Sequence, residues 1–137
     1  MTGGTWDTVR VNPSARRRQV PPGWPVQVPE PTADDWSDRA CLWLLDLSPA
    51  EYRSYPLLRR HPMLLSWLAA RNVDAQLTAA RQAYARARAE VGSELGAKVL
   101  GELLATLEQE GARLLAVQRE IALVGSALRG EPYVPRL

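Results

Sequence analysis

The sequence is short of several residue types, and each shortage narrows what the chain can be. Cys41 is the only cysteine, so the chain can form no internal disulfide and no thiolate metal cluster. Phenylalanine is absent, and Lys98 is the only lysine among the 17 basic residues. This preference for arginine fits codon usage in a GC-rich genome better than an arginine-specific function.

The sequence also lacks any run of about 20 apolar residues, which is the length that a membrane-spanning helix needs. Its first residues show no basic region followed by an apolar stretch, so they do not resemble a secretory leader. The formal net charge is only +2, and acids and bases are mixed along most of the chain. We therefore expect one soluble cytoplasmic domain whose charge indicates neither nucleic acid nor a membrane as its partner.

Two long stretches carry residues at alternating spacings of three and four, which places each set on one face of a helix. The first set is Ala70, Val73, Leu77, Ala80, Tyr84, Ala87 and Val91, and the second is Leu100, Leu104, Leu107, Gly111, Leu114, Gln118, Ile121, Gly125 and Leu128. Because fewer than ten residues separate the two sets, the second helix must fold back on the first. The pattern predicts a long antiparallel hairpin that resembles a coiled coil.

Caps and prolines predict the ends of the helices. The two long helices are expected at about 62–92 and 97–129, joined by a turn over Gly92–Gly96 and stopped by Gly130 and Pro132. Two shorter helices are expected before them.

Thr32 is expected to cap the first short helix, at about 33–47, with Asp34 and Asp35 in its first turn. Ser48 and Pro49 are expected to open the second, at about 49–55, and Pro56 to stop it. The predicted fold is therefore all-α: a hairpin braced by one or two shorter helices, with extended proline-rich ends at 1–31 and 131–137.

Two further expectations concern the glycines and the additional apolar residues of the fourth helix, at about 97–129. Gly101, Gly111 and Gly125 weaken a helix unless close packing compensates, and we expect bulky residues opposite them, with Tyr84 near Leu107 to Gly111 and Trp67 near Val124 and Gly125. Five apolar residues widen the face beyond what one partner helix covers: Leu103, Leu115, Val117, Leu123 and Val124. We expect the first short helix to cover them, with dimerisation as an additional possibility.

Residues 1–31 are interpreted as an attachment arm. Six prolines favour an extended backbone there, yet the arm also carries large aromatic residues and a run of three arginines, which simple spacers seldom do. The predicted partner-binding residues are Trp6, Arg16, Arg17, Arg18, Trp24 and Tyr133. Two interpretations stay open: the arm docks on another protein, or it wraps its own helices beside Trp36 and Trp67.

Residues with chemical potential are few, and each has a plainer explanation. His61 with Arg53, Arg59 and Arg60 could form an anion-binding corner, but a surface turn with a His-Pro cap is the preferred explanation. The carboxylates of Asp34, Asp35 and Asp38 are ordinary helix-start residues, and Cys41 with His61 lacks a third orienting group. The sequence therefore predicts no catalytic residue, no metal site and no cofactor.

The functional expectation is a non-enzymatic protein-protein interaction module, an adaptor or small subunit of a larger assembly. The expected partner is a protein, with a homodimer possible. The alternative is a nucleic-acid-associated protein that uses the arginine-rich arm. Against it, Arg81, Arg86 and Arg88 of the third helix are expected to pair with the acids Glu102, Glu108 and Glu110 of the fourth. A small-molecule sensor with a pocket between helices is the third hypothesis.

Overall fold

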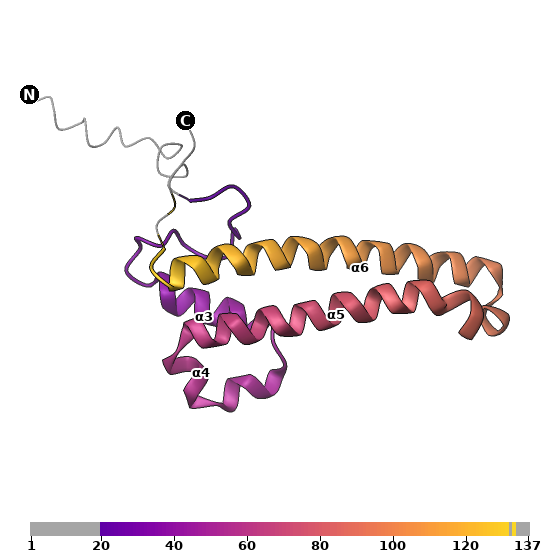
Figure 1. Ribbon diagram of the computed structural model, residues 1–137, viewed down its shortest axis with the longest axis horizontal. Helices are drawn as coiled ribbons and strands as arrows, with labels where there is room; N and C mark the ends of the chain where they lie inside the picture. The colour runs from indigo at the N-terminus through magenta and orange to yellow at the C-terminus, as the bar shows by residue number, and fades with distance from the viewer. Residues whose placement is uncertain (1–19, 132, 134–137) are drawn as a thin grey trace, which may run out of the picture.

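The computed structural model describes residues 20–131 and Tyr133, and every regular element within them is a helix. In chain order the elements are α3 (Trp36–Asp46), the 3₁₀-helix η1 (Ala50–Ser54), α4 (Pro56–Arg60), α5 (Pro62–Glu90) and α6 (Gly92–Leu128). Figure 1 shows α5 and α6 lying side by side along their lengths, with the shorter helices at one end. The predicted all-α fold, a long helical hairpin with shorter N-terminal helices, is confirmed.

Three contacts spaced along the hairpin define its register. They join Ser66 to Gly125, Asp74 to Gln118, and Tyr84 to Glu108. The Gln118 amide donates to the Asp74 carboxylate at 2.6 Å, and the Tyr84 hydroxyl donates to Glu108 at 3.2 Å. Residue numbers rise along α5 as they fall along α6, so the helices are antiparallel. The expected position of Tyr84, opposite the stretch from Leu107 to Gly111, is confirmed.

The turn at the tip of the hairpin depends on one glycine. Only Val91 separates the end of α5 from the start of α6. Gly96, inside the first turns of α6, has φ 78° and ψ 162°, a conformation that is essentially restricted to glycine. The long regular part of α6 therefore starts after Gly96, where the sequence predicts a helix start.

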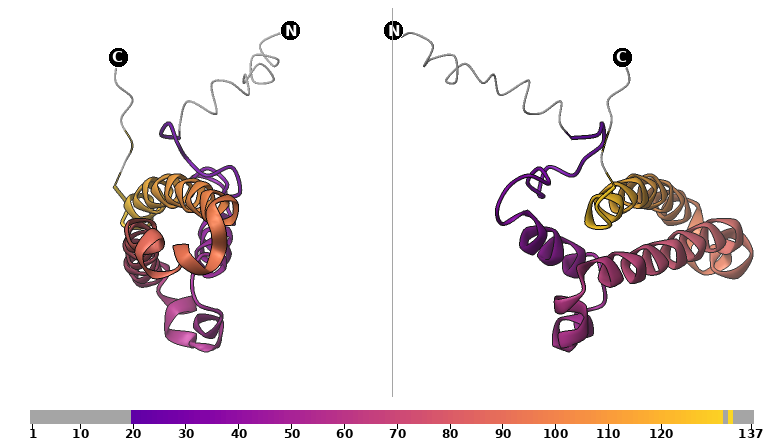
Figure 2. Two further views of the ribbon diagram at one scale, coloured as in Figure 1. Left: turned by 90° about the vertical axis from the view of Figure 1, so that its right-hand side faces the viewer. Right: turned by 60° about the vertical axis from the view of Figure 1, so that its left-hand side comes forward.

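The core lies at the end of the hairpin opposite the tip, where α3 packs against both long helices as a third layer (Figure 2). One cluster joins buried residues of α3, α5 and α6: Ala40, Cys41, Trp43, Leu44, Leu45, Leu65, Ala69, Val73, Leu77, Leu114, Val117, Ile121 and Val124. Towards the tip, the described seam buries only Ala87 and Leu104. The hairpin is thus braced at one end and stands as two helices at the other.

The bracing helix covers only part of the wide apolar face of α6. Val117 and Val124 are buried in the core cluster, as expected. Leu115 is still 37% exposed, and Leu103 is half-buried. The expectation that the first helix covers this face is wrong for these two residues, because an 11-residue helix is only about 16 Å long.

The close-packing explanation holds for one internal glycine and is wrong for two. A Cβ at Gly125 would lie 2.6 Å from the Ser66 hydroxyl, whereas one at Gly101 or Gly111 would meet no atom within 4 Å. The close neighbour of Gly125 is also not Trp67, whose side chain points far enough outward to be 49% exposed.

The short helices agree only in part with the expected ones. α3 begins at Trp36, after Asp35, because residues 30–36 first form two tight turns, closed by bonds from Ala33 N–H to Glu30 and from Trp36 N–H to Ala33. Thr32 therefore caps no helix. The second short helix, expected at about 49–55, is present as η1, which ends at Ser54 before Pro56. Pro56 also starts α4, which the sequence did not predict, since proline suits a first helical position as well as it suits a break.

Residues 20–35 run as irregular chain over the helical body. Pro25 and Val28 are buried, with Val28 only 3% exposed, and Val28 belongs to the core cluster. This part of the predicted arm therefore lies on its own domain. The rest of the arm lies outside the described residues.

Candidate functional site

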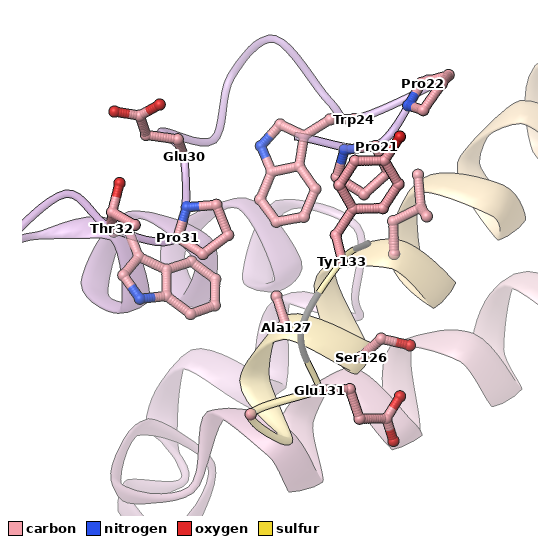
Figure 3. Close-up of a pocket in the computed structure, with 13 residues that line it drawn as sticks. Pro21, Pro22, Trp24, Glu30, Pro31, Thr32, Ser126, Ala127, Glu131 and Tyr133 are labelled. Atoms are coloured by element: carbon pink, nitrogen blue, oxygen red, sulfur yellow. The ribbon is translucent and has the colours of Figure 1, made fainter. Parts of the chain in front are cut away.

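A groove lies between residues 20–35 and the C-terminal end of α6, and it encloses about 850 Å³ (Figure 3). We call it the terminal groove and define it by its apolar lining: Pro21, Trp24, Trp36, Leu123, Ala127 and Tyr133. A pocket of this size with a mostly apolar lining is typical of ligand and peptide sites.

A glycine turn shapes the first wall. The Trp24 N–H bonds to the Pro21 carbonyl at 3.1 Å, and Gly23 has φ +91°. Proline followed by a left-handed glycine is the signature of a type II turn, so Pro22 and Gly23 explain why the chain reverses here. A second turn follows, closed by the bond from Val28 N–H to the Pro25 carbonyl at 3.2 Å. The buried side chains of Pro25 and Val28 anchor the wall to the core.

Two tryptophans give this wall its aromatic surface. The indole N–H of Trp24 donates to the Val28 carbonyl at 2.8 Å, which fixes the ring. The ring centroids of Trp24 and Trp36 are 6.3 Å apart and the planes are tilted by 48°, within the range of favourable aromatic contacts. Both side chains are half-buried and leave part of their surface to the groove.

The opposite wall is built by the end of α6. Gly130 has φ +79°, the N–H of Glu131 bonds to the Ser126 carbonyl at 3.0 Å, and the N–H of Gly130 bonds to the Ala127 carbonyl at 3.0 Å. These two bonds form a Schellman motif, which is why the helix stops at this glycine. In Figure 3 Tyr133 and Ala127 on this side and Trp24 and Pro21 on the first wall line the same groove.

The described charged residues that line the terminal groove are both acidic. They are Glu30 on the first wall and Glu131 on the second, and Figure 3 shows their carboxylates at the edges of the groove. An apolar centre with an acidic rim favours an aromatic or aliphatic group that carries cationic neighbours.

A second pocket, of about 670 Å³, lies on the other side of Trp36. Its apolar lining is Leu57, Met63, Leu64 and Leu128, and Arg60 and His61 stand beside it. Apolar surface therefore continues around this end of the molecule, from the terminal groove to the start of α5.

The predicted partner-binding residues divide into two groups. The structure brings Trp24 and Tyr133 together in the terminal groove, although they are far apart in the sequence. Trp6, Arg16, Arg17 and Arg18 lie outside the described residues, and their role stays a prediction.

One of the two interpretations of the arm placed it beside Trp36, and Trp36 does line the groove with Trp24. Sequence reasoning did not anticipate that Leu123 and Ala127 line it too. Leu123 lies off the hairpin seam, and this was the one signal for an additional contact surface.

The lone thiol is unsuited to nucleophilic chemistry. Cys41 is 8% exposed, and burial raises the pKa of its thiol, with smaller opposing contributions from Arg59, which lowers it, and Asp38, which raises it. The thiol is therefore protonated at neutral pH, and a neutral thiol is a poor nucleophile. Within the described residues no three side chains from His, Cys, Asp and Glu are grouped to hold a metal ion.

The expected ion pairs between the long helices are wrong for all three acids, since none of the ion pairs among the described residues joins α5 to α6. Glu108 accepts a bond from Tyr84, and Glu110 pairs with Arg113 of its own helix at 2.8 Å, which lowers the pKa of Glu110. Arg53 was expected to help His61 bind an anion, but it pairs with the Asp46 carboxylate instead.

Among the described residues no helix has the length and apolar character needed to cross a bilayer. Comparison of the chain with protein-family models, with curated proteins and with solved structures finds no match. The geometry above is therefore the basis for any inference about function.

Proposed function

We propose that the chain is a non-enzymatic, cytoplasmic protein-protein interaction module, an adaptor or small subunit of a larger assembly. In this proposal the hairpin sets the shape, the braced end carries the contact surface, and the N-terminal arm serves as an attachment segment. The expected partner is a protein.

The observation that carries the proposal is an exposed apolar patch at the start of α5. We define the α4–α5 patch as Leu57, Met63 and Trp67, each of which is 49% exposed. Met63 and Trp67 are four residues apart and so lie on the same helix face, and Leu57 and Met63 line one pocket.

The composition of this patch fits a binding surface. Tryptophan and methionine are enriched at protein interfaces, and a tryptophan with half of its surface free is a strong anchor. The guanidinium of Arg71 lies 5.6 Å from the Trp67 ring centroid, a favourable cation–π contact at the edge of the patch. At about 25 cal/mol per Å² of apolar surface removed from water, covering three such side chains adds several kcal/mol to binding.

The test compares the patch with a surface of equal exposure elsewhere. Full-length protein is used to capture partners from its native lysate, and the masses of the captured complexes are measured by native mass spectrometry. We expect a stoichiometric complex with the wild-type chain and its loss when Leu57, Met63 and Trp67 are all changed to Ser.

The matched control is Val99→Ser, because Val99 is 47% exposed but lies near the tip of the hairpin. This variant should retain the complex. A wild-type chain that stays monomeric and binds no protein stoichiometrically contradicts the proposal, as does a complex that both variants retain equally.

A further inference from the structure

We propose that the terminal groove is the binding site for residues 1–19 of the same chain. Trp6 occupies the apolar centre of the groove, and the arginines at 16–18 lie at its acidic rim. This contact is a property of the isolated chain and goes beyond the partner binding proposed above.

Chemistry is the first argument. The groove offers aromatic and apolar surface at its centre, from Trp24, Trp36 and Leu123, and carboxylates from Glu30 and Glu131 at its edges. Residues 1–19 carry one aromatic residue, Trp6, and most of their charge is the basic run Arg16-Arg17-Arg18. An indole against aromatic walls and guanidinium groups beside carboxylates are both favourable contacts.

The position of the chain is the second argument. Pro21 lines the groove, and the described chain begins at the residue before it, Val20. The arginine run ends two residues before Val20, so it is tethered beside the rim. Trp6 is 14 residues before Val20, a reach of up to about 46 Å, which is ample for the chain to return to the groove.

Tethering also decides between this chain and a second copy. A segment joined to its site by a short flexible linker has an effective concentration in the millimolar range. A second copy at micromolar concentration competes poorly with that, so the arm of the same chain fills the groove.

The residues that follow Tyr133 in this sequence are a weaker candidate for the same space. Val134–Leu137 come directly after one wall of the groove, and a reversal of the chain takes about four residues. None of these four residues is aromatic.

The test is nuclear magnetic resonance on the full chain at low concentration. We expect nuclear Overhauser effects between the Trp6 ring protons and the Ala127 methyl group. Trp6→Ala should abolish them and shift the indole N–H signals of Trp24 and Trp36. Val9→Ala, the matched change within the same segment, should leave those two signals in place.

The proposed contact between the arginine run and the acidic rim is tested by changing Arg16, Arg17 and Arg18 to Ala. We expect the Overhauser effects of Trp6 to weaken in this variant, and to weaken in the wild-type chain as salt rises. If the triple variant keeps them at full strength, the assignment of the arginines to the rim is wrong.

A sample that mixes isotope-labelled and unlabelled chains identifies the source of the arm. Overhauser effects between labelled and unlabelled chains would overturn the proposal in favour of a second copy. The absence of any effect from Trp6 to the groove in the wild-type chain would overturn it outright. Neither outcome depends on whether another protein binds the α4–α5 patch.

Discussion

At the scale of single residues, a close contact between the two long helices depends on a glycine that faces a serine. Ser66 is 2% exposed, and its hydroxyl occupies the space that a side chain at Gly125 would need. Elsewhere on α6, Gly111 faces open space. The same substitution should therefore have opposite effects at the two glycines.

We predict that Gly111→Ala raises the free energy of unfolding by about 0.5 to 1 kcal/mol, because alanine favours the helix. Gly125→Ala should lower it by about 1 to 2 kcal/mol, since overpacking against Ser66 exceeds that gain. In a Ser66→Ala background, Gly125→Ala should become stabilising. Urea denaturation of the four variants and the wild type measures this. Equal gains at both glycines would show that the helices are not in close contact here.

The buried thiol gives a pH-dependent prediction. Burial raises the pKa of Cys41 above its ordinary value of 9.0. Below pH 9 the Cys41 thiol is protonated in both the folded and the unfolded chain, so its burial stabilises the fold in full. As the pH rises above about 9, the unfolded chain loses the proton first, and stability falls until the folded thiol also ionises. Thermal melts across this range should show a loss in the wild-type chain that is smaller in Cys41→Ala. Parallel curves for the two proteins would mean that the thiol is solvent-accessible.

At the scale of secondary-structure elements, a helix could be predicted where the sequence pattern allowed only one interpretation. The seam residues from Val73 to Ala87 repeat over many turns, so the pattern predicts α5 almost to the residue. Gly130 likewise marks the end of α6, because a left-handed residue is needed there. Around Pro56, by contrast, a single proline is compatible with either the end or the start of a helix, and only the packing of Leu58 in the core decides.

The tip offers the sharpest prediction at this scale. Gly96 adopts a conformation reserved for glycine, and a Cβ added there would meet no atom within 4 Å, so any cost of substitution comes from the backbone alone. Gly96→Ala should lower the free energy of unfolding by about 1 to 3 kcal/mol.

Gly101→Ala is the matched control, since Gly101 also faces open space but lies in regular helix. It should stabilise the protein by about 0.5 to 1 kcal/mol in the same denaturation experiment. A Gly96→Ala variant as stable as Gly101→Ala would show that the tip turns in another way.

At the scale of the whole molecule, stability should be graded along the hairpin. Three layers meet around Ala69 and Ile121, whereas only two helices meet around Ala87 and Leu104. Hydrogen exchange followed by mass spectrometry should show amides near the tip exchanging at least about tenfold faster than those at the braced end, a difference of about 1.4 kcal/mol. Uniform protection along both helices would mean that something also covers the tip.

The candidate site was only partly predictable because it combines distant segments. Trp24 and Tyr133 were predicted as contact residues because they are large aromatic residues in proline-rich parts of the chain. Nothing in the sequence indicated that they line one groove, since this depends on the turn at Gly23 and the reversal at Gly130. Trp36 was named only as a neighbour of the arm, and its exact place in the groove wall depends on the irregular chain at 30–35, after which α3 starts.

The central claim is that the two long helices fold back on each other within one chain. It is tested by the distance between spin labels at Arg71→Cys and Arg119→Cys in a Cys41→Ala background, diluted with unlabelled protein. Both positions are exposed, one on each helix. Adjacent antiparallel helices predict a distance within about 25 Å. A distance near 70 Å, roughly the length of one continuous helix between these sites, would contradict the account.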